Sequence, residues 1–287
     1  MHHFKVLSCS AGAAVLLAAQ PAFAQDAAEK PFDGVYVGGS IGYSVQRNDV
    51  GEGVQFDRDL NGTFGDTVVN AGGANVFGLR TTGAFDGGFC NGVANGNNLA
   101  AGCSNDRDDV EYYGRVGYDK QFSHLVVGAL FEFGKSNVSD SVTAYTTTPA
   151  AYQFTRKLDW NASLRGRLGY AVKKTLFYGT AGATYGKIDS SFFTTNTVNA
   201  FNDRGRDYSW GFQVGGGIEQ KIGKKFSIGV EYLYTRFTED DYLVRASRGT
   251  AAANHPFVLG NAMGTDFQRT DSNFDFHSLR ATIAYRF

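Results

Sequence analysis

The chain has 287 residues, a formal net charge of −1, 37 glycines and only 4 prolines, and 14% of its residues are aromatic. A nearly neutral chain lacks the basic surface that phosphate contacts require, so we expect no nucleic-acid partner. Frequent glycine and aromatic residues, rare proline and a slightly negative mean hydropathy suit a protein of many strands that each have one wet face.

The N-terminus has the three parts of a secretory signal. Lys5 supplies the positive charge, an apolar stretch follows, and Ala22-Phe23-Ala24 forms a small-residue cleavage site. We therefore predict a signal peptide over 1–24 and a short periplasmic lead over 25–32. A lipoprotein anchor at Cys9 is the alternative, but no apolar stretch precedes that cysteine. No later stretch approaches the roughly 20 apolar residues of a membrane helix, so any membrane span would use strands.

From residue 33 onward, apolar and polar residues alternate in segments of about ten residues, the pattern of a transmembrane β-barrel. In the last segment, Leu279 and Ile283 fall on one face of a strand and Ser278 and Arg280 on the other. We predict an all-β fold: an eight-stranded antiparallel transmembrane β-barrel over 33–287, with four long extracellular loops and short periplasmic turns. The first long loop covers about 47–108. The predicted strands are 33–46, 109–122, 124–138, 155–171, 175–190, 206–222, 225–238 and 272–287.

The outward face of these strands carries aromatic residues near both ends, as expected for the two membrane interfaces. The outer set is Tyr43, Tyr112, Trp160, Trp210 and Tyr234, and the inner set is Tyr118, Tyr170, Phe226, Tyr285 and Phe287. A soluble lipocalin-type barrel is the alternative, because alternation alone does not say which face meets lipid. The aromatic sets and the unequal loop lengths favour the membrane barrel.

The inward face carries charges of both signs, which predicts a salt-bridged interior. These residues are Glu111, Arg115, Glu132, Asp159, Arg165, Arg167, Glu219, Glu231 and Arg280. An eight-stranded barrel is only wide enough for side chains to fill it. We therefore expect a charged plug, with an ion pathway as the alternative.

Five stretches of the chain resemble the eight-stranded outer-membrane surface antigens of alphaproteobacteria, which are related to opacity proteins and to the OmpA membrane domain. They are Gly34–Gly39, Ser163–Tyr170, Phe177–Ala183, Val214–Glu219 and Glu231–Thr235. The resemblance implies a surface protein of the bacterial outer membrane with a structural, porin-like or host-contact role and no catalytic residues. It also implies that the terminal Phe287 is the signal read by the barrel-assembly machinery.

Two features distinguish the long first loop. Cys90 and Cys103 are the only cysteines after the predicted signal peptide, and in an oxidising compartment we expect them to form a disulfide that stabilises the loop by roughly 3 kcal/mol. A metal site is the alternative, but two isolated thiols lack the partners that zinc needs.

The second feature is the sequence Asp57-Arg58-Asp59-Leu60-Asn61-Gly62, which matches the opening of a calcium loop. The match is incomplete, because Val68 stands where a bidentate glutamate belongs. Asp66, or the acidic segment 106–109, would have to complete the shell. The candidate Ca²⁺ ligands are therefore Asp57, Asp59, Asn61 and Asp66, and a solvated turn is the alternative.

Catalysis is disfavoured because a nucleophile must lie within hydrogen-bond reach of its base. His277 and Ser278 are adjacent on a strand and point to opposite faces, while His124 and His255 fall in separate connections. We therefore predict a non-enzymatic structural surface protein, with a narrow pore or a loop-based adhesin or receptor as alternatives. The expected partners are outer-membrane lipid, lipopolysaccharide, the barrel-assembly machinery and a host or surface ligand.

Overall fold

The computed structural model describes residues 30–46, 51–80, 85–239 and 242–287. The predicted signal peptide and most of the predicted periplasmic lead lie outside these residues. Within them, no helix is both long enough and apolar enough to cross a membrane.

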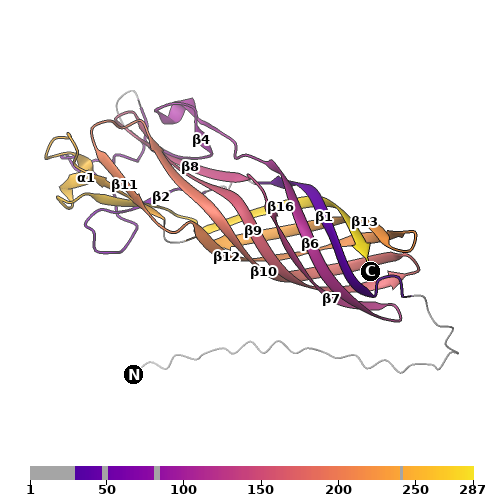
Figure 1. Cartoon of the computed structure of the whole chain (residues 1–287). Helices are drawn as coiled ribbons and strands as arrows, with labels where there is room; N and C mark the ends of the chain where they lie inside the picture. Colours follow the sequence, from indigo (N-terminus) through magenta and orange to yellow (C-terminus); the bar gives the residue numbers. More distant parts are fainter. Residues whose placement is uncertain (1–29, 47–50, 81–84, 240–241) are drawn as a thin grey trace, which may run out of the picture.

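Eight antiparallel strands form a closed barrel, as the sequence predicted (Figure 1). Their order around the ring is β10-β12-β13-β16-β1-β6-β7-β9, and β9 pairs with β10 to close it. The strands are β1 Gly34–Val45, β6 Asp109–Phe122, β7 Leu125–Lys135, β9 Ala150–Val172, β10 Thr175–Thr194, β12 Tyr208–Ile222, β13 Phe226–Thr238 and β16 Asn273–Arg286. Tight turns join β6 to β7, β9 to β10 and β12 to β13 at one end, which we call the turn end.

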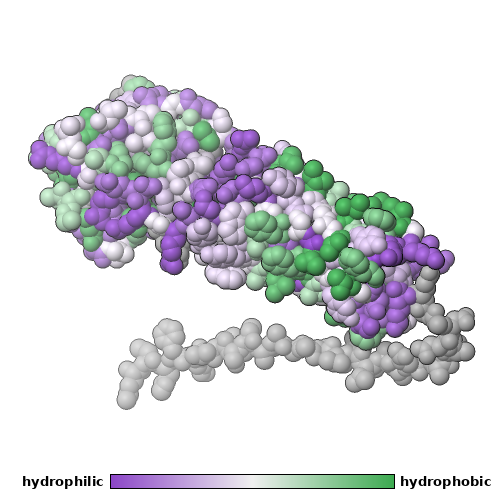
Figure 2. All heavy atoms as spheres, in the orientation of Figure 1, coloured by the Kyte–Doolittle hydropathy of each residue, from purple (hydrophilic) through white to green (hydrophobic). Residues whose placement is uncertain are grey.

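Alternation along each strand divides the barrel into an apolar outside and a polar inside. On β16, Leu279 and Ile283 are more than half exposed, whereas Ser278 and Arg280 are buried. Successive strand side chains point to opposite faces, so this pattern repeats around the ring. Figure 2 shows the resulting apolar surface on the half of the barrel near the turn end, with polar surface beyond it on either side. Such a surface suits a hydrocarbon environment.

Two interior tyrosines fit against glycines of the neighbouring strands. A Cβ atom added to Gly117 would lie 2.3 Å from the ring of Tyr36, and one added to Gly134 would lie 2.3 Å from the ring of Tyr113. Only glycine allows these rings to lie flat on the barrel wall, which accounts for part of the high glycine content.

The structure departs from the predicted strands at the end opposite the tight turns. The predicted strand 124–138 ends at Lys135, and a separate strand β8, Ser139–Thr146, begins after a short break. β9 starts five residues earlier than predicted and β10 runs four residues further. These extensions carry the sheet beyond the barrel.

The long connections are also more ordered than predicted, because they contain strands of their own. A four-stranded antiparallel sheet has the order β11-β14-β15-β2, and β3 adds to the edge of β8. The additional elements are β2 Val54–Asp57, β3 Gly88–Asn91, β4 Val93–Ala94, β5 Cys103–Ser104, β11 Ala200–Arg204, β14 Leu243–Ser247, β15 Thr265–Arg269, the 3₁₀ turn Leu99–Ala101 and α1 Pro256–Leu259. Together with β8 and the far halves of β9 and β10 they form a single structure, which we call the cap (Figure 1).

The cap has its own hydrophobic core, which makes it a folded unit. Phe56, Phe77 and Phe267 form its centre, with the Phe56 ring 4.4 Å from that of Phe77 and 5.0 Å from that of Phe267. Valines, alanines and aromatic residues from all four long connections complete this cluster. Burial of large aromatic side chains is worth several kcal/mol in total, enough to order loops that would otherwise be solvated.

Candidate functional site

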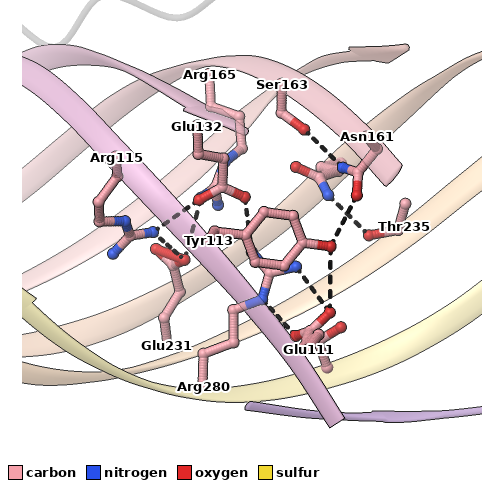
Figure 3. A network of polar contacts seen from close by, with 12 residues as sticks. Glu111, Tyr113, Arg115, Glu132, Asn161, Ser163, Arg165, Glu231, Thr235 and Arg280 are labelled. Carbon is pink, nitrogen blue, oxygen red and sulfur yellow. Dashed lines mark hydrogen bonds and ion pairs between the residues drawn. The ribbon is translucent and has the colours of Figure 1, made fainter. Parts of the chain in front are cut away.

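The centre of the barrel holds a network of ion pairs that crosses from one wall to the other (Figure 3). Arg115 on β6 contacts Glu132 at 3.0 Å and Glu231 at 2.8 Å. Arg165 on β9 contacts the same two carboxylates at 2.8 and 3.1 Å. Because β13, which carries Glu231, stands opposite β7, which carries Glu132, these contacts bridge the lumen.

Arg280 on β16 joins a further carboxylate to the same network. Its guanidinium contacts Glu111 at 2.5 Å and Glu132 at 2.6 Å, and it lies 4.1 Å from the centre of the Tyr113 ring. Ser44 donates a hydrogen bond of 2.7 Å to Glu111. The six ions Glu111, Arg115, Glu132, Arg165, Glu231 and Arg280 are all buried, and we call them the central network.

A second group of ions lies between the central network and the turn end. Arg286 contacts Asp119 at 2.8 Å, and Arg167 contacts both Asp119 at 3.4 Å and Glu219. The Tyr36 ring lies 4.7 Å from the Arg286 guanidinium. These four ions form the turn-end cluster. Asp119 and Arg286 were absent from the predicted set, although both have inward parity.

Positive and negative groups are equal in number in both clusters. Three arginines face three glutamates in the central network, and two arginines face two acids in the turn-end cluster. A buried ion is tolerated only when it is paired and hydrogen-bonded. Each of these side chains is therefore held by its partners, and the two clusters carry no excess of one charge of the kind that typically selects ions in a pore.

An apolar layer separates the barrel interior from the cap. Its members are Val138, Leu158, Ile188, Phe237, Phe274 and Phe276, all fully buried. Apolar side chains at this level exclude water and leave hydrated ions no polar partner.

Asp159 does not join the interior, which corrects one of the nine predicted positions. Lys187 pairs with Trp160, but the next residue, Ile188, pairs with Leu158, so Asp159 is left at a β-bulge. A bulge adds one residue to a strand. Beyond it, side chains that would have pointed inward point outward, and those that would have pointed outward point inward. Asp159 is partly exposed and contacts Lys135 at 3.1 Å on the outside of the barrel.

The same bulge turns Arg156 inward and creates a cluster that the sequence did not reveal. Arg156 contacts Asp140 at 2.7 Å, and Arg269 contacts Asp140 at 2.8 Å and Glu52 at 2.6 Å. We call these four residues the cap cluster. Burial disfavours the charged form of Arg269, but the charges of Asp140 and Glu52 outweigh burial and raise its pKa. Burial raises the pKa of Glu52.

Asp106 lies beside the cap cluster in the first long connection. Its Oδ1 accepts a hydrogen bond of 2.7 Å from the Ser141 amide. Burial and, after it, the negative charge of Asp140 raise the pKa of Asp106 from 3.8 to about 7. Asp106 is therefore a group whose charge changes within the physiological pH range.

The disulfide between Cys90 and Cys103 is present, as predicted, with its two Cα atoms 6.1 Å apart. It ties β3 to β5, and β3 in turn pairs with β8 at the edge of the extended sheet. The Tyr145 hydroxyl donates a hydrogen bond of 3.0 Å to the carbonyl of Gly102, next to Cys103. The disulfide thus fastens the first connection to the body of the cap.

The candidate calcium ligands Asp57, Asp59 and Asp66 lie together, with one carboxylate oxygen from each within 4.8 Å of the others. The donor set suits a hard cation. However, Asp57 accepts amide hydrogen bonds from Asn61 at 3.1 Å and Gly62 at 2.8 Å. Asp66 accepts one from Arg58 at 2.8 Å. These hydrogen bonds close the turn around the carboxylates.

Of the other proposed ligands, Asn61 lies beside this cluster, because its side-chain amide donates a hydrogen bond of 3.0 Å to Asp59. No carboxylate of the segment 106–109 belongs to the described cluster. The Asn61 side chain oxygen accepts the amide of Thr63 at 2.7 Å. Asp106 bonds to Ser141, and Asp109 pairs with Arg107 at 3.6 Å.

The residues considered for catalysis lie apart, on two faces of the barrel. Ser278 is buried inside, with its hydroxyl 3.4 Å from that of Ser44. His277 lies on the outer face, where its Nδ1 is 2.6 Å from the Tyr232 hydroxyl. Adjacent strand residues point in opposite directions, so His277 does not reach Ser278.

A closed antiparallel barrel with an apolar outer surface and a polar interior defines an integral β-barrel protein of the bacterial outer membrane. The family described as outer membrane protein beta-barrel domain matches residues 10–287, and the chain belongs to this family. Both the fold and the location in the outer membrane agree with the sequence predictions.

Curated relatives carry the same description. The 31 kDa outer-membrane immunogenic protein of Brucella melitensis is 27% identical over 175 residues, which cover 60% of this chain and 64% of the relative. The 22 kDa outer membrane protein of Rhizobium leguminosarum bv. viciae is 28% identical over 166 residues, 57% of this chain and 70% of the relative. The match thus spans a little under two thirds of the Brucella protein's length.

Among solved structures, the attachment invasion locus protein Ail of Yersinia pestis aligns with 89% of this chain and 99% of its own. The identity is 12% and the TM-score is 0.33.

Proposed function

We propose that the protein is a non-enzymatic structural surface protein of the outer membrane, a sealed barrel that holds a folded cap outside the cell. The observation that carries this proposal is the balanced set of buried ion pairs that bridge the lumen between Arg115, Arg165, Glu132 and Glu231. The apolar layer beyond the central network supports it. Side chains that are locked to one another fill an eight-stranded barrel and do not line a channel.

The orientation follows from the lengths of the connections. Outer-membrane barrels have short periplasmic turns and longer extracellular loops, so the cap would lie on the cell surface. There it faces lipopolysaccharide and the surroundings, in agreement with the description of the Brucella relatives as immunogenic. Phe287, at the end of β16, would be the contact for the barrel-assembly machinery.

Conductance in a planar lipid bilayer tests the sealed barrel. Insertion is checked first by the heat-dependent shift in gel migration that folded barrels show. We expect no discrete steps from the wild-type protein. The proposal would be refuted by conductance steps whose size changes in Glu132→Gln but not in Lys135→Gln, the matched variant on the outer surface. Such steps would show that ions pass through the central network and that the barrel is a narrow pore.

We further propose that the Asp57, Asp59 and Asp66 cluster binds Ca²⁺ only weakly, with a Kd on the order of 1 mM, as in weak extracellular modules. A carboxylate oxygen can accept an amide hydrogen bond and bind a cation at once, but the amide bonds to Asp57 and Asp66 take up part of the negative charge that the ion would use. Calorimetric titration of the EDTA-treated protein should give weak heats that disappear in Asp59→Asn and persist in Asp108→Asn. A micromolar Kd would show that the site is stronger than its hydrogen bonds imply.

A further inference from the structure

At the far tip of the cap lies a cavity of about 820 Å³. All four long connections contribute to it, through residues 70–80, 146–150, 195–198 and 255–257. Its volume falls within the roughly 300–1,000 Å³ of small-molecule sites. Segments this far apart in sequence meet here only because the cap is folded.

The wall of this cavity is made mainly of uncharged side chains that can both donate and accept hydrogen bonds. These are the hydroxyls of Thr146, Thr147, Thr148, Thr195 and Thr197 and the amides of Asn70, Asn75 and Asn196. Among the described lining residues there is no carboxylate, and Arg80 is the one guanidinium. The Nη1 of Arg80 already lies 3.4 Å from the Thr147 carbonyl, to which it donates a hydrogen bond.

The floor of the cavity is aromatic and held in place from below. The rings of Tyr152 and Phe257 meet edge to face with their centres 5.5 Å apart, and both belong to the hydrophobic core of the cap. Asn196 donates hydrogen bonds of 2.9 Å to the Tyr152 hydroxyl and to the Asn199 side chain. This bonding orients polar groups of the wall before any ligand arrives, which lowers the entropic cost of binding.

His255 adds a directed donor at the edge of the floor. Its Nδ1 accepts the amide hydrogen of Phe257 at 3.3 Å, so the ring proton of the neutral form sits on Nε2. Burial lowers the pKa of His255, which favours the neutral ring. The His255 ring centre lies 5.0 Å from that of Phe257.

We propose that this cavity binds a neutral, hydroxyl-rich ligand, a short segment of an oligosaccharide. A sugar ring presents hydroxyls around its edge, which match threonine and asparagine side chains, and a face of C–H groups, which packs on aromatic and apolar residues such as Phe257 and Pro256. Among the described lining residues a polyanion would find only the Arg80 guanidinium to pair with, and a fully apolar ligand would offer no partner to the hydroxyls of Thr147, Thr148 and Thr197. The inference goes beyond the sealed barrel and needs only that the cap is folded and accessible.

Two sources present this chemistry at a bacterial surface: the saccharide chains of lipopolysaccharide in the same membrane, and glycans of other cells. Full-length protein, refolded in detergent with its disulfide intact, is therefore titrated by calorimetry with separate probes. One is neutral O-polysaccharide freed of lipid A, and the others are maltotriose and triacetylchitotriose. Dextran sulfate is the anionic comparison.

Substitution at Ala74 blocks the cavity without removing a side-chain hydrogen bond. Ala74 lines the cavity and is held by bonds of its backbone to Asn70. Ala71 lies in the same turn, is also exposed, and is outside the lining. We expect Ala74→Trp to abolish saccharide binding and Ala71→Trp to leave it unchanged. The isosteric Thr197→Val should weaken binding about 2- to 10-fold, because one hydrogen bond is lost.

Binding of the O-polysaccharide alone would assign the cavity to saccharides of the protein's own envelope. Binding of a trisaccharide alone would assign it to an external glycan. Either result supports the proposal.

The proposal is overturned if no neutral probe binds, if Ala74→Trp binds as well as wild type, or if dextran sulfate binds more tightly and displaces the neutral probe. If Ala74→Trp does not fold, as judged by gel migration, unchanged affinity in Thr197→Val and Thr148→Val overturns it. All these variants lie in the cap, outside the barrel interior, so we expect none of them to change the conductance, and failure here is distinct from failure of the sealed barrel.

Discussion

Replacing Asp106 by asparagine should remove a pH dependence from the stability of the cap. The Asp106 carboxyl is surrounded by Asp140 on β8 and Glu52 in the first connection, together with Arg269 and, through Asp140, Arg156. Burial and the charge of Asp140 raise the pKa of Asp106 from 3.8 to about 7. The folded cap therefore binds a proton that the unfolded segment releases between about pH 4 and 7.

The sign follows from this difference in bound protons. Stability falls with rising pH wherever the folded state binds more protons than the unfolded state. The contribution of Asp106 is therefore fully present below about pH 4 and is lost as pH rises through 7. A shift of about 3 units corresponds to about 4 kcal/mol at most, and partial exposure of Asp106 reduces the expected loss to about 1–3 kcal/mol.

Asparagine keeps the hydrogen bond from the Ser141 amide to Oδ1 but carries no charge at any of these pH values. We expect Asp106→Asn to protect the β8 amides at pH 8 roughly 5- to 150-fold better than wild type, the equivalent of about 1–3 kcal/mol, with a difference that shrinks as the pH falls to about 4. Hydrogen exchange followed by mass spectrometry, corrected for intrinsic rates, measures this. Asp108→Asn, which keeps the acceptor for the Gln46 amide, is the matched control. Wild-type protection that rises from pH 5 to pH 8, or an Asp106→Asn profile identical to wild type, would refute the reasoning.

Three further outcomes are expected. Arg280→Met should lower the free energy of unfolding in urea by about 3–5 kcal/mol, because it leaves the buried Glu111 without its arginine and takes one of three arginines from Glu132; an unchanged midpoint would mean that the central network contributes no stability. Cys90→Ser with Cys103→Ser should destabilise the first connection by roughly 3 kcal/mol, seen as faster exchange in β3 with the barrel unaffected. Gly117→Ala would place a Cβ 2.3 Å from the Tyr36 ring and should cost about 1–3 kcal/mol, measured by the temperature of the gel shift; no change would show that the ring moves freely.

The barrel could be predicted from the chain because membrane strands obey a local rule. Side chains alternate with a period of two, and one face must be apolar along the whole span. All eight predicted barrel strands overlap observed ones, and the strand from 109 to 122 has the predicted bounds. Eight of the nine predicted inward charges are buried for the same reason.

The exception shows where a local rule fails. In a regular strand Asp159 would point to the same inward face as Arg165. A bulge opposite Lys187 and Ile188 lies at Asp159 and breaks this alternation. A bulge depends on how two strands pair, and nothing in the sequence near Asp159 marks it. The extra residue in this bulge also turns Arg156 inward, where Arg156 contacts Asp140.

The cap was decided by tertiary structure alone. Its strands are short, and Phe56 of the first connection and Phe267 of the last share its core although each has polar neighbours in sequence. No period reveals that they share a core, because the barrel beneath must first bring the four connections together. The sequence by itself determined a membrane barrel, its charged interior and the disulfide. Only the folded chain decided that its loops become a second core with a polar cavity at its tip, because those contacts join segments that the sequence keeps far apart.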